Sequence, residues 1–486
     1  FFSPLFLHGL GLGGWMSGRQ HIYTAVRALG IPQGDVSNHE QKPDSGKSEG
    51  VFLSVDPENA QVAVQNRDGQ AEIYEVDKCF MGGTKEMAQF LDAVGMQLVN
   101  NAISGYNTCL ISYGKYDTAA HPGEVEQLSA SFVSHLFDAL GTSNGQDYEW
   151  TLHVDAVEVH PSLGLHDLLS TKSGDKRRGG FLISENSSGG YYVEGLSTVQ
   201  VKDAQELHSA LASAAAKRIF VDPAVGIANA LVYLRITRNR FSTCKSTDLG
   251  IAKWCITSSL RSSIVLVDLV GAVPAALQPL AMPGSVVGPF EALSETIAEL
   301  SGGPGAAQSP LSKLLSDFIG GNAKTLLLTH VQGNFVQEQE NVQQALRKVQ
   351  LCKGIQNTPV VLEDPNAQTC GTLLEDLNQL RALTADTPDA DGLHEESSLT
   401  LQMVLLLHSI WETQAAALAV TKGREKADRK AQVIASSSNQ AKIRHQQNKR
   451  AQYRESERRW LELLAQKRQA LKALTEKKLQ FLDSMG

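Results

Sequence analysis

The sequence has 486 residues, which allows one large domain plus an extension. Hydrophobic residues make up 42% and charged residues 20% of the chain, and no uninterrupted apolar run reaches the roughly 18 residues of a membrane-spanning helix. The six cysteines include no C-x-x-C pair, which excludes the patterns of a zinc site and of a disulfide-rich secreted scaffold, so we expect reduced, buried thiols.

The first part of the chain predicts an α/β domain. Its apolar residues from 85 to 101 recur at helical spacing and lead into a strand-like run at 108–113. Further short runs predict strands at 51–55, 61–64, 151–159 and 263–268. Exposed loops are expected at 33–50, 170–180 and 302–310, where Gly, Pro and polar residues are frequent.

The composition changes near residue 360, where prolines are followed by an acidic stretch. We predict a head at 1–359, a linker or neck at 360–398 and a helical, basic tail at 399–486. Apolar residues of the tail mark a heptad seam, in which lysines hold two positions. The seam comprises Trp460, Leu464, Lys467, Leu471, Leu474, Lys478 and Phe481. A coiled coil, a helical hairpin and a helix docked on a larger assembly all fit this pattern.

Six stretches resemble, in the right order, motifs of the kinesin motor domain. They are Gly105–Gly114, Gly190–Leu207, Leu266–Gly271 (LVDLVG), Phe290–Leu300, Ser309–Thr325 (SPLSKLLSDFIGGNAKT) and Glu340–Pro359. The resemblance implies a kinesin-like motor domain with a central mixed sheet flanked by helices on both faces, followed here by the helical tail.

The phosphate-binding loop that the resemblance implies is degenerate. The family pattern G-x-T-G-x-G-K-[ST] aligns with Gly114-Lys-Tyr-Asp-Thr-Ala-Ala-His121. Such a loop needs glycines for close backbone approach, a lysine for the phosphates and a hydroxyl for Mg²⁺. Here Asp117 replaces a glycine, Ala120 replaces the lysine and His121 replaces the hydroxyl residue, while Lys115 lies on the wrong side of the loop.

The two nucleotide-sensing motifs are altered as well. The first aligns with Asn239–Ser246, where Asn239 and Ser242 match but Cys244 stands in place of the family's arginine. The second keeps Asp268 and Gly271 but has Val273 in place of the glutamate. Because both ends of the expected ion pair are replaced, we expect no enzyme activity, no catalytic residue, no metal and no cofactor. The degenerate site would comprise Gly114, Lys115, Asp117, Ala120, His121, Asn239, Ser242, Asp268 and Gly271.

The tail is strongly basic. Residues 422–478 hold 17 Lys and Arg against 6 Asp and Glu, although the whole chain has a net charge of −8. With few aromatic residues for base stacking, this region favours tubulin, the microtubule or a microtubule-associated protein over nucleic acid or a membrane. The candidate partner-binding residues are Lys422, Arg424, Lys430, Lys442, Arg444, Lys449, Arg450, Arg458 and Arg459. The seam also permits self-association.

These patterns predict a non-catalytic structural or adaptor protein of a microtubule-based assembly. Its expected location is the cytoplasm and cytoskeleton, with the axoneme of a cilium or flagellum as one setting. Two alternatives stay open. In one, the chain is a slow ATP-driven motor in which Lys115 or Lys245 supplies a missing cation; in the other, it is a switch that binds ATP or ADP with Mg²⁺ without turnover.

Overall fold

The computed structural model describes most of the chain in sixteen ranges. These are residues 21–29, 52–65, 70–81, 85–114, 132–141, 147–160, 164–170, 181–185, 190–218, 228–246, 251–270, 296–300, 307–332, 339–386, 391–434 and 440–485. Unit 1 comprises 1–143, 151–236 and 261–362, and unit 2 comprises 144–150, 237–260 and 363–486. Each unit is described by itself.

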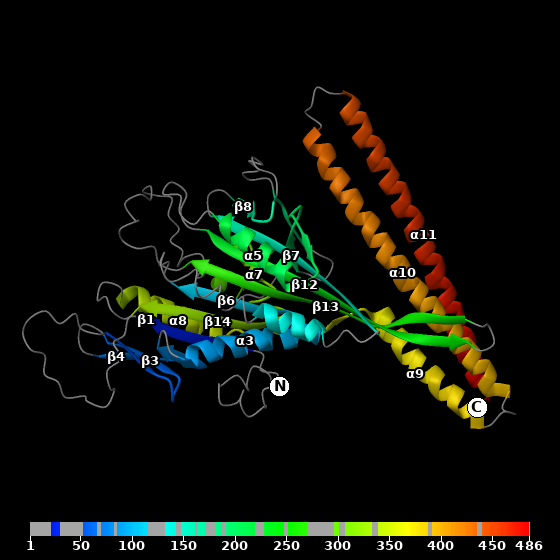
Figure 1. Ribbon diagram of the computed structural model, residues 1–486, viewed down its shortest axis with the longest axis horizontal. Coiled ribbons are helices and arrows are strands. Elements are labelled where there is room, and N and C mark those ends of the chain that lie inside the picture. Colours follow the sequence, from blue (N-terminus) through cyan, green and yellow to red (C-terminus); the bar gives the residue numbers. More distant parts are fainter. Residues whose placement is uncertain are drawn as a thin grey trace, which may run out of the picture. The chain divides into compact units, whose positions relative to one another are not determined.

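A mixed ten-stranded sheet forms the centre of the fold, in the order β11-β7-β12-β13-β6-β14-β1-β5 with β8 beside β7 and β15 beside β13 (Figure 1). The strands are β1 (Tyr23–Leu29), β5 (Lys78–Met81), β6 (Thr108–Gly114), β7 (Tyr148–His160), β8 (Gly164–Asp167), β11 (Val199–Val201), β12 (Asn229–Ser246), β13 (Ile251–Val270), β14 (Lys324–Gln332) and β15 (Leu362–Glu363). Strand β6 is parallel to β13 and β14, whereas β11 is antiparallel to β7. The mixed sheet predicted from the sequence is therefore confirmed.

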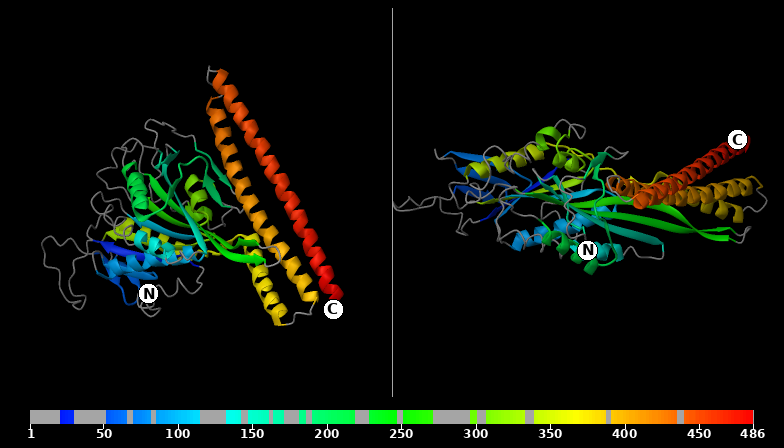
Figure 2. Two further views of the ribbon diagram at one scale, coloured as in Figure 1. Left: turned by 45° about the vertical axis from the view of Figure 1, so that its right-hand side comes forward. Right: turned by 90° about the horizontal axis from the view of Figure 1, so that it is seen from above.

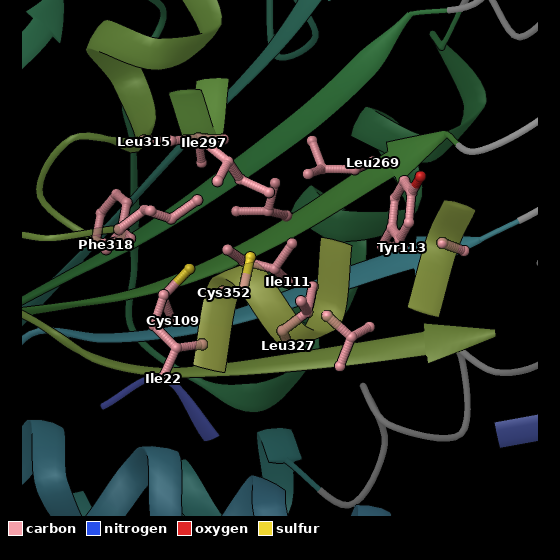
Figure 3. Packing of buried hydrophobic residues seen from close by; sticks show 14 of the residues in the cluster. Ile22, Cys109, Ile111, Tyr113, Leu269, Ile297, Leu315, Phe318, Leu327 and Cys352 are labelled. Carbon is pink, nitrogen blue, oxygen red and sulfur yellow. The ribbon is translucent and has the colours of Figure 1, made fainter. Parts of the chain in front are cut away.

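Helices cover both faces of this sheet in unit 1. On one face, Cys109, Ile111 and Tyr113 of β6 join a buried cluster with helices α7 (Pro310–Leu315) and α8 (Gln339–Lys353), part of which Figure 3 shows. On the other face, the hydroxyl of Thr108 donates to the carbonyl of Leu98 on helix α3 (Lys85–Ile103). The alternation of side chains along β6 thus places one helical layer on each side.

Two smaller sheets, a further helix and helical residues at 132–141 and 296–300 also belong to unit 1. Strands β2 (Leu53–Asp56), β3 (Gln61–Gln65) and β4 (Ala71–Glu75) form an antiparallel sheet, and β9 (Ile183–Glu185) pairs with β10 (Tyr191–Val193). Helix α5 (Ala204–Ala216) begins where the side chain of Asp203 accepts from the backbone N–H of Glu206, as an N-cap does. Of the three expected loops, most residues lie outside the described ranges, but Ser309 and Pro310 begin helix α7.

In the predicted linker or neck at 360–398, most of the described residues belong to strand β15 or to helices. Backbone N–H groups of alternate residues donate to the core of unit 1, from Thr358 to the carbonyl of Gly321 (2.9 Å) and from Leu362 to that of Gly105 (3.1 Å). Helix α9 (Pro365–Asp386) follows directly, and Asp364 caps its first turn. The prolines of this region do not exclude a helix, because Pro365 is a favourable first residue of a helix as well as a helix breaker.

Unit 2 packs three helices against strand residues that we had predicted to belong to the head. Helices α10 (Asp391–Ile434) and α11 (Gln440–Met485) run side by side (Figures 1 and 2). Their neighbour α9 contributes to a buried cluster with β12 and β13, formed by Cys244, Cys255, Cys370, Leu374, Leu377, Val404 and Leu407. The helical tail is confirmed, but its unit begins at Glu363 and includes 144–150 and 237–260. All six cysteines are free and buried, as expected.

The predicted heptad seam of α11 is the face that contacts α10. Its lysines are held by hydroxyl groups, since the Nζ of Lys467 lies 2.7 Å from the Oγ of Ser409 and that of Lys478 lies 2.8 Å from the Oγ1 of Thr400. Of the three arrangements that the sequence left open, the chain adopts a helical hairpin.

Helix α10 has a second property that the sequence reading missed. Its stretch Gly392–Glu425 is long and apolar enough to cross a membrane by length and composition alone, with a mean hydropathy of 1.4, and 39% of its most apolar part is buried within the structure. A core helix of a soluble protein meets the same criterion. Val404 and Leu407 of this stretch pack in the cluster of unit 2.

Candidate functional site

The candidate site lies at the carboxyl edge of three parallel strands of unit 1. Ligands of open α/β sheets bind outside this edge. The strand register aligns Ser112 of β6 with Asp268 of β13, and Gly114 of β6 with His330 of β14. The sequence had singled out Gly114 and Asp268, and the fold brings them to neighbouring strand ends.

Gly114 is needed where it stands because the chain passes so close to His330. A Cβ atom at Gly114 would lie 2.7 Å from the Cβ of His330 and 2.9 Å from its carbonyl oxygen. The imidazole is buried, and its Nε2 lies 3.2 Å from the Oγ of Ser112. The surviving glycine of the loop motif therefore has a packing role.

Asp268 is held by an arginine. Arg218 follows helix α5, and its Nη1 donates to the Oδ2 of Asp268. The Nε of the same guanidinium lies 3.7 Å from the Oε1 of Glu158, a side chain that is only 1% exposed. Its Nη2 also donates to the carbonyl of Ala228 (3.4 Å). One guanidinium thus lies between two carboxylates at this edge, and its single positive charge is shared by them.

Asn239 and Ser242 are not part of this edge. Both lie on β12 within unit 2, where the Oγ of Ser259 donates to the Oδ1 of Asn239 at 2.8 Å. Ser259 precedes Asp268 by nine residues on β13. The letters N-x-x-S therefore matched a segment that forms a long strand and bonds across the sheet. Of the other predicted residues, Lys115, Asp117, Ala120, His121 and Gly271 lie outside the described ranges.

The comparison with protein families decides which fold this edge belongs to. The model of the kinesin motor domain matches residues 33–353. The chain belongs to the kinesin motor-domain family. Among solved structures, it resembles a dimer of KIF14 in a two-heads-bound state with AMP-PNP, in complex with a microtubule. That match has 22% identity and a TM-score of 0.57, and it covers 74% of this chain and 100% of the other, which shows a shared fold.

Curated kinesins match over much of the chain at low identity. The kinesin-like protein KIF13B of Homo sapiens is 24% identical over 398 residues, which cover 75% of this chain and 21% of that protein. The kinesin-like protein klp-20 of Caenorhabditis elegans is 22% identical over 339 residues, which cover 66% of this chain and 50% of that protein. The kinesin heavy chain of Syncephalastrum racemosum is 23% identical, with 67% of this chain and 34% of that protein covered. The chain thus spans half or less of the length of these relatives.

Motif reading of this kinesin-like chain missed several residues of the edge. Arg218, Glu158 and His330 were not singled out, because they belong to no contiguous motif and their partners are distant in the sequence. The available signal was the presence of carboxylates in a strand that also carries apolar residues, as at Asp155 and Glu158 in the run from Tyr148 to His160. A buried strand rarely holds such a residue without a partner.

The predicted basic residues of this kinesin-like chain differ in how far they are engaged within unit 2. Some are engaged within the hairpin, where the Nε of Arg424 lies 3.1 Å from the Oε2 of Glu457 and the Nε of Arg450 donates to Asp428. Arg458 and Arg459 contact Glu455 from more exposed positions. Lys442, Arg444 and Lys449 are exposed on α11. Lys422 and Lys430 lie on α10, with side chains outside the described set.

Proposed function

We propose that this kinesin-like chain is a non-catalytic structural or adaptor protein of a microtubule-based assembly. Its motor-like unit would serve as a docking platform and its basic helical hairpin as an anchor. The observation that carries the proposal is the loop after Gly114, in which Ala120 and His121 replace the lysine and the hydroxyl residue of the family pattern.

The donor set at the edge does not fit a Mg²⁺–nucleotide. Phosphoryl transfer depends on positioned cations and hydrogen-bond donors around the phosphates. The sequence after Gly114 offers Asp117, a negative charge, where the family has a glycine. The family's arginine and glutamate are replaced by Cys244 and Val273, and Cys244 is buried in unit 2. We therefore derive no step through ATP or Mg²⁺.

The contacts at the described edge of the sheet support a structural role for Gly114 and Asp268, the two residues of the family motifs that are retained there. Asp268 pairs with Arg218, so the chain itself supplies a cation to this carboxylate. Gly114 is packed against His330, which accounts for the glycine without a phosphate ligand.

The proposed partner follows from the relatives. KIF14 was solved in complex with a microtubule, and its fold covers 74% of this chain. We extend that partner to this chain as part of the proposal, with the cytoplasmic cytoskeleton as the location and the ciliary or flagellar axoneme as a setting to be tested by imaging.

The test combines nucleotide binding with microtubule binding. Fluorescent ATP and ADP are titrated with Mg²⁺ into the full chain, phosphate release is followed with and without microtubules, and co-sedimentation measures binding to microtubules. An active kinesin motor domain serves as the positive control. We expect neither saturable nucleotide binding nor phosphate release, together with co-sedimentation that ATP does not change.

The opposite result identifies which alternative holds. Microtubule-stimulated phosphate release would mean that the chain is a motor, and its loss in Lys115→Ala or Lys245→Ala would identify the replacement cation. Saturable ADP binding without phosphate release would mean that the chain is a switch. Failure to sediment with microtubules would remove the proposed partner.

A further inference from the structure

The outer surface of helix α11 carries a groove of about 520 Å³ that the proposed function does not use. The groove is lined by Gln447, Arg450, Ala451, Arg454, Glu455 and Arg458. Three of the six residues are arginines spaced four apart, which places them on one face of the helix. Arg454 was not among the basic residues selected from the sequence.

The arginine at one end of this groove is held by the neighbouring helix, and the two arginines farther along it are more exposed. The Nε of Arg450 donates to Asp428 of α10, which fixes that side chain. Arg454 and Arg458 are 60% and 66% exposed, although the Nη2 of Arg454 lies 4.0 Å from the Oδ1 of Asp428 and the Nε of Arg458 lies 3.8 Å from the Oε1 of Glu462. Glu455 accepts from the Nη2 of Arg458 at 2.7 Å and restrains it. The six lining residues carry three arginines and one glutamate, a net charge of +2, and ion pairs with Asp428 and Glu462 preorganise the guanidinium groups.

The spacing of the arginines fits an extended chain. Residues four apart on a helix are separated by about 6 Å along its axis. Alternate side chains of an extended polypeptide repeat at about 6.6–6.8 Å, so carboxylates on every second residue match the arginine row. Guanidinium groups bind carboxylates with paired hydrogen bonds. We propose that this groove binds an extended acidic polypeptide segment that carries carboxylates on alternate residues.

Two other anionic partners fit the groove less well. Single-stranded nucleic acid needs aromatic side chains on which bases stack. The nearest aromatic residue, Tyr453, instead packs toward α10, where a Cβ at Gly423 would lie 2.5 Å from its ring. Insertion into an anionic membrane would need apolar side chains on the surface of the helix. Ala451 is the sole apolar residue of the lining.

This inference deepens the anchoring part of the proposed function and rests on it for its biological role. The test uses the full chain and a fluorescent peptide of alternating glutamate and serine, with binding measured by anisotropy at low and near-physiological salt. The double variant Arg454→Glu with Arg458→Glu reverses two groove charges. The matched control, Arg468→Glu with Lys472→Glu, makes the same change in net charge on the same helix outside the groove.

We expect the groove variant to weaken peptide binding at least about tenfold, and the control to weaken it about twofold or less, since charged hydrogen bonds exceed long-range attraction at physiological salt. Circular dichroism verifies that both variants keep their helices. Equal weakening by the two variants, or tighter binding of single-stranded RNA or phosphatidylserine vesicles, would overturn the inference. If the unaltered chain does not bind the peptide but still co-sediments with microtubules, the proposed role of the groove is wrong and the proposed function stands. If the chain releases phosphate but binds the peptide through the groove, the proposed function is wrong and the groove inference stands.

Discussion

The ammonium group of Lys467 lies 2.7 Å from the hydroxyl of Thr413, in the middle of the seam between α11 and α10. The same Nζ donates to the hydroxyl of Ser409 at 2.7 Å, and the hydroxyl of Thr413 donates to the carbonyl of Ser409. A lysine at an apolar seam position is costly unless its donors are satisfied. Here the partner helix supplies acceptors at one register, so the pair selects one alignment of the two helices.

Lys467→Ala should lower the free energy of unfolding by about 1–3 kcal/mol, because it removes hydrogen bonds from a charged group and leaves the two hydroxyls without that donor. The measurement is denaturation by urea, followed by circular dichroism. Arg468→Ala, at the exposed neighbouring position, is the control and should change stability by no more than about 0.5 kcal/mol. Equal effects of the two substitutions would contradict a specific role for Lys467.

Gly371→Ala should destabilise the packing of α9 on β13. A Cβ at Gly371 would lie 2.5 Å from the carbonyl oxygen of Thr257, closer than atoms approach, so the helix must shift at a cost of about 1–3 kcal/mol. Gly141 makes the matched control, because its added Cβ would meet nothing within 4 Å. Gly141→Ala should raise stability by about 0.4–1 kcal/mol through the entropy of the unfolded chain. Thermal unfolding that moves in the same direction for both variants would refute this contrast.

Glu299 should make the free energy of unfolding depend on pH in the acidic range. Burial raises the pKa of this carboxyl, but hydrogen bonds from Ser312 and from the backbone N–H groups of Gln308 and Ser309 lower it by more, so its pKa lies below the usual value. A carboxyl with a lowered pKa stabilises the fold above its unfolded pKa, near 4.3, and loses that contribution as the pH falls through the folded value.

Glu299→Gln should therefore cost about 1 kcal/mol at neutral pH and almost nothing in strong acid, because the protonated carboxyl and the amide are then both neutral. Denaturation at a series of pH values between 3 and 7 measures the difference. A difference that stays constant over this range would show that the charge of Glu299 has no part in it.

Asn357→Ala should be among the most destabilising single changes in unit 1. The side-chain amide is buried and donates to the carbonyls of Phe318 (2.9 Å) and Ala323 (2.8 Å), and its oxygen accepts from the N–H of Gly320 (2.7 Å). Its loss leaves several buried groups unsatisfied, at about 1–3 kcal/mol for each. Gln356→Ala, at an exposed neighbour, is the control. A loss below about 1 kcal/mol in chemical denaturation would contradict this role.

The fold was predictable from the sequence wherever apolar periodicity was continuous. The strand at 108–113 and the helix at 85–101 are found as β6 and α3 with nearly the same bounds. The pairing of Arg218 with Asp268 was not predictable, because it joins residues fifty positions apart, one after helix α5 and the other on β13. The division into units failed for the same reason, since Cys244 and Cys255 of the head pack with Cys370 of the predicted linker.

The seam of α11 was also predictable, because a period of 3.5 is visible in one helix alone. The periodicity could not reveal that helix α10 of the same chain packs against this seam. Lys467 and Lys478 look like defects in an apolar repeat, yet each meets a hydroxyl of α10. Similarly, the basic run was visible, but the groove around Arg454 depends on which side chains α10 leaves exposed.

The occupied seam has a consequence for assembly. Since α10 already covers the apolar face of α11, two copies cannot join through this seam by simple encounter. A dimer through the seam would require each hairpin to open and each α11 to take the place of its counterpart on the other copy, which is an exchange of identical elements. Such a dimer would retain the same hydrogen bonds at Lys467 and Lys478, and its rate of formation would be set by the opening of the hairpin rather than by diffusion. A freshly prepared monomer would then stay monomeric for as long as its hairpin stays closed.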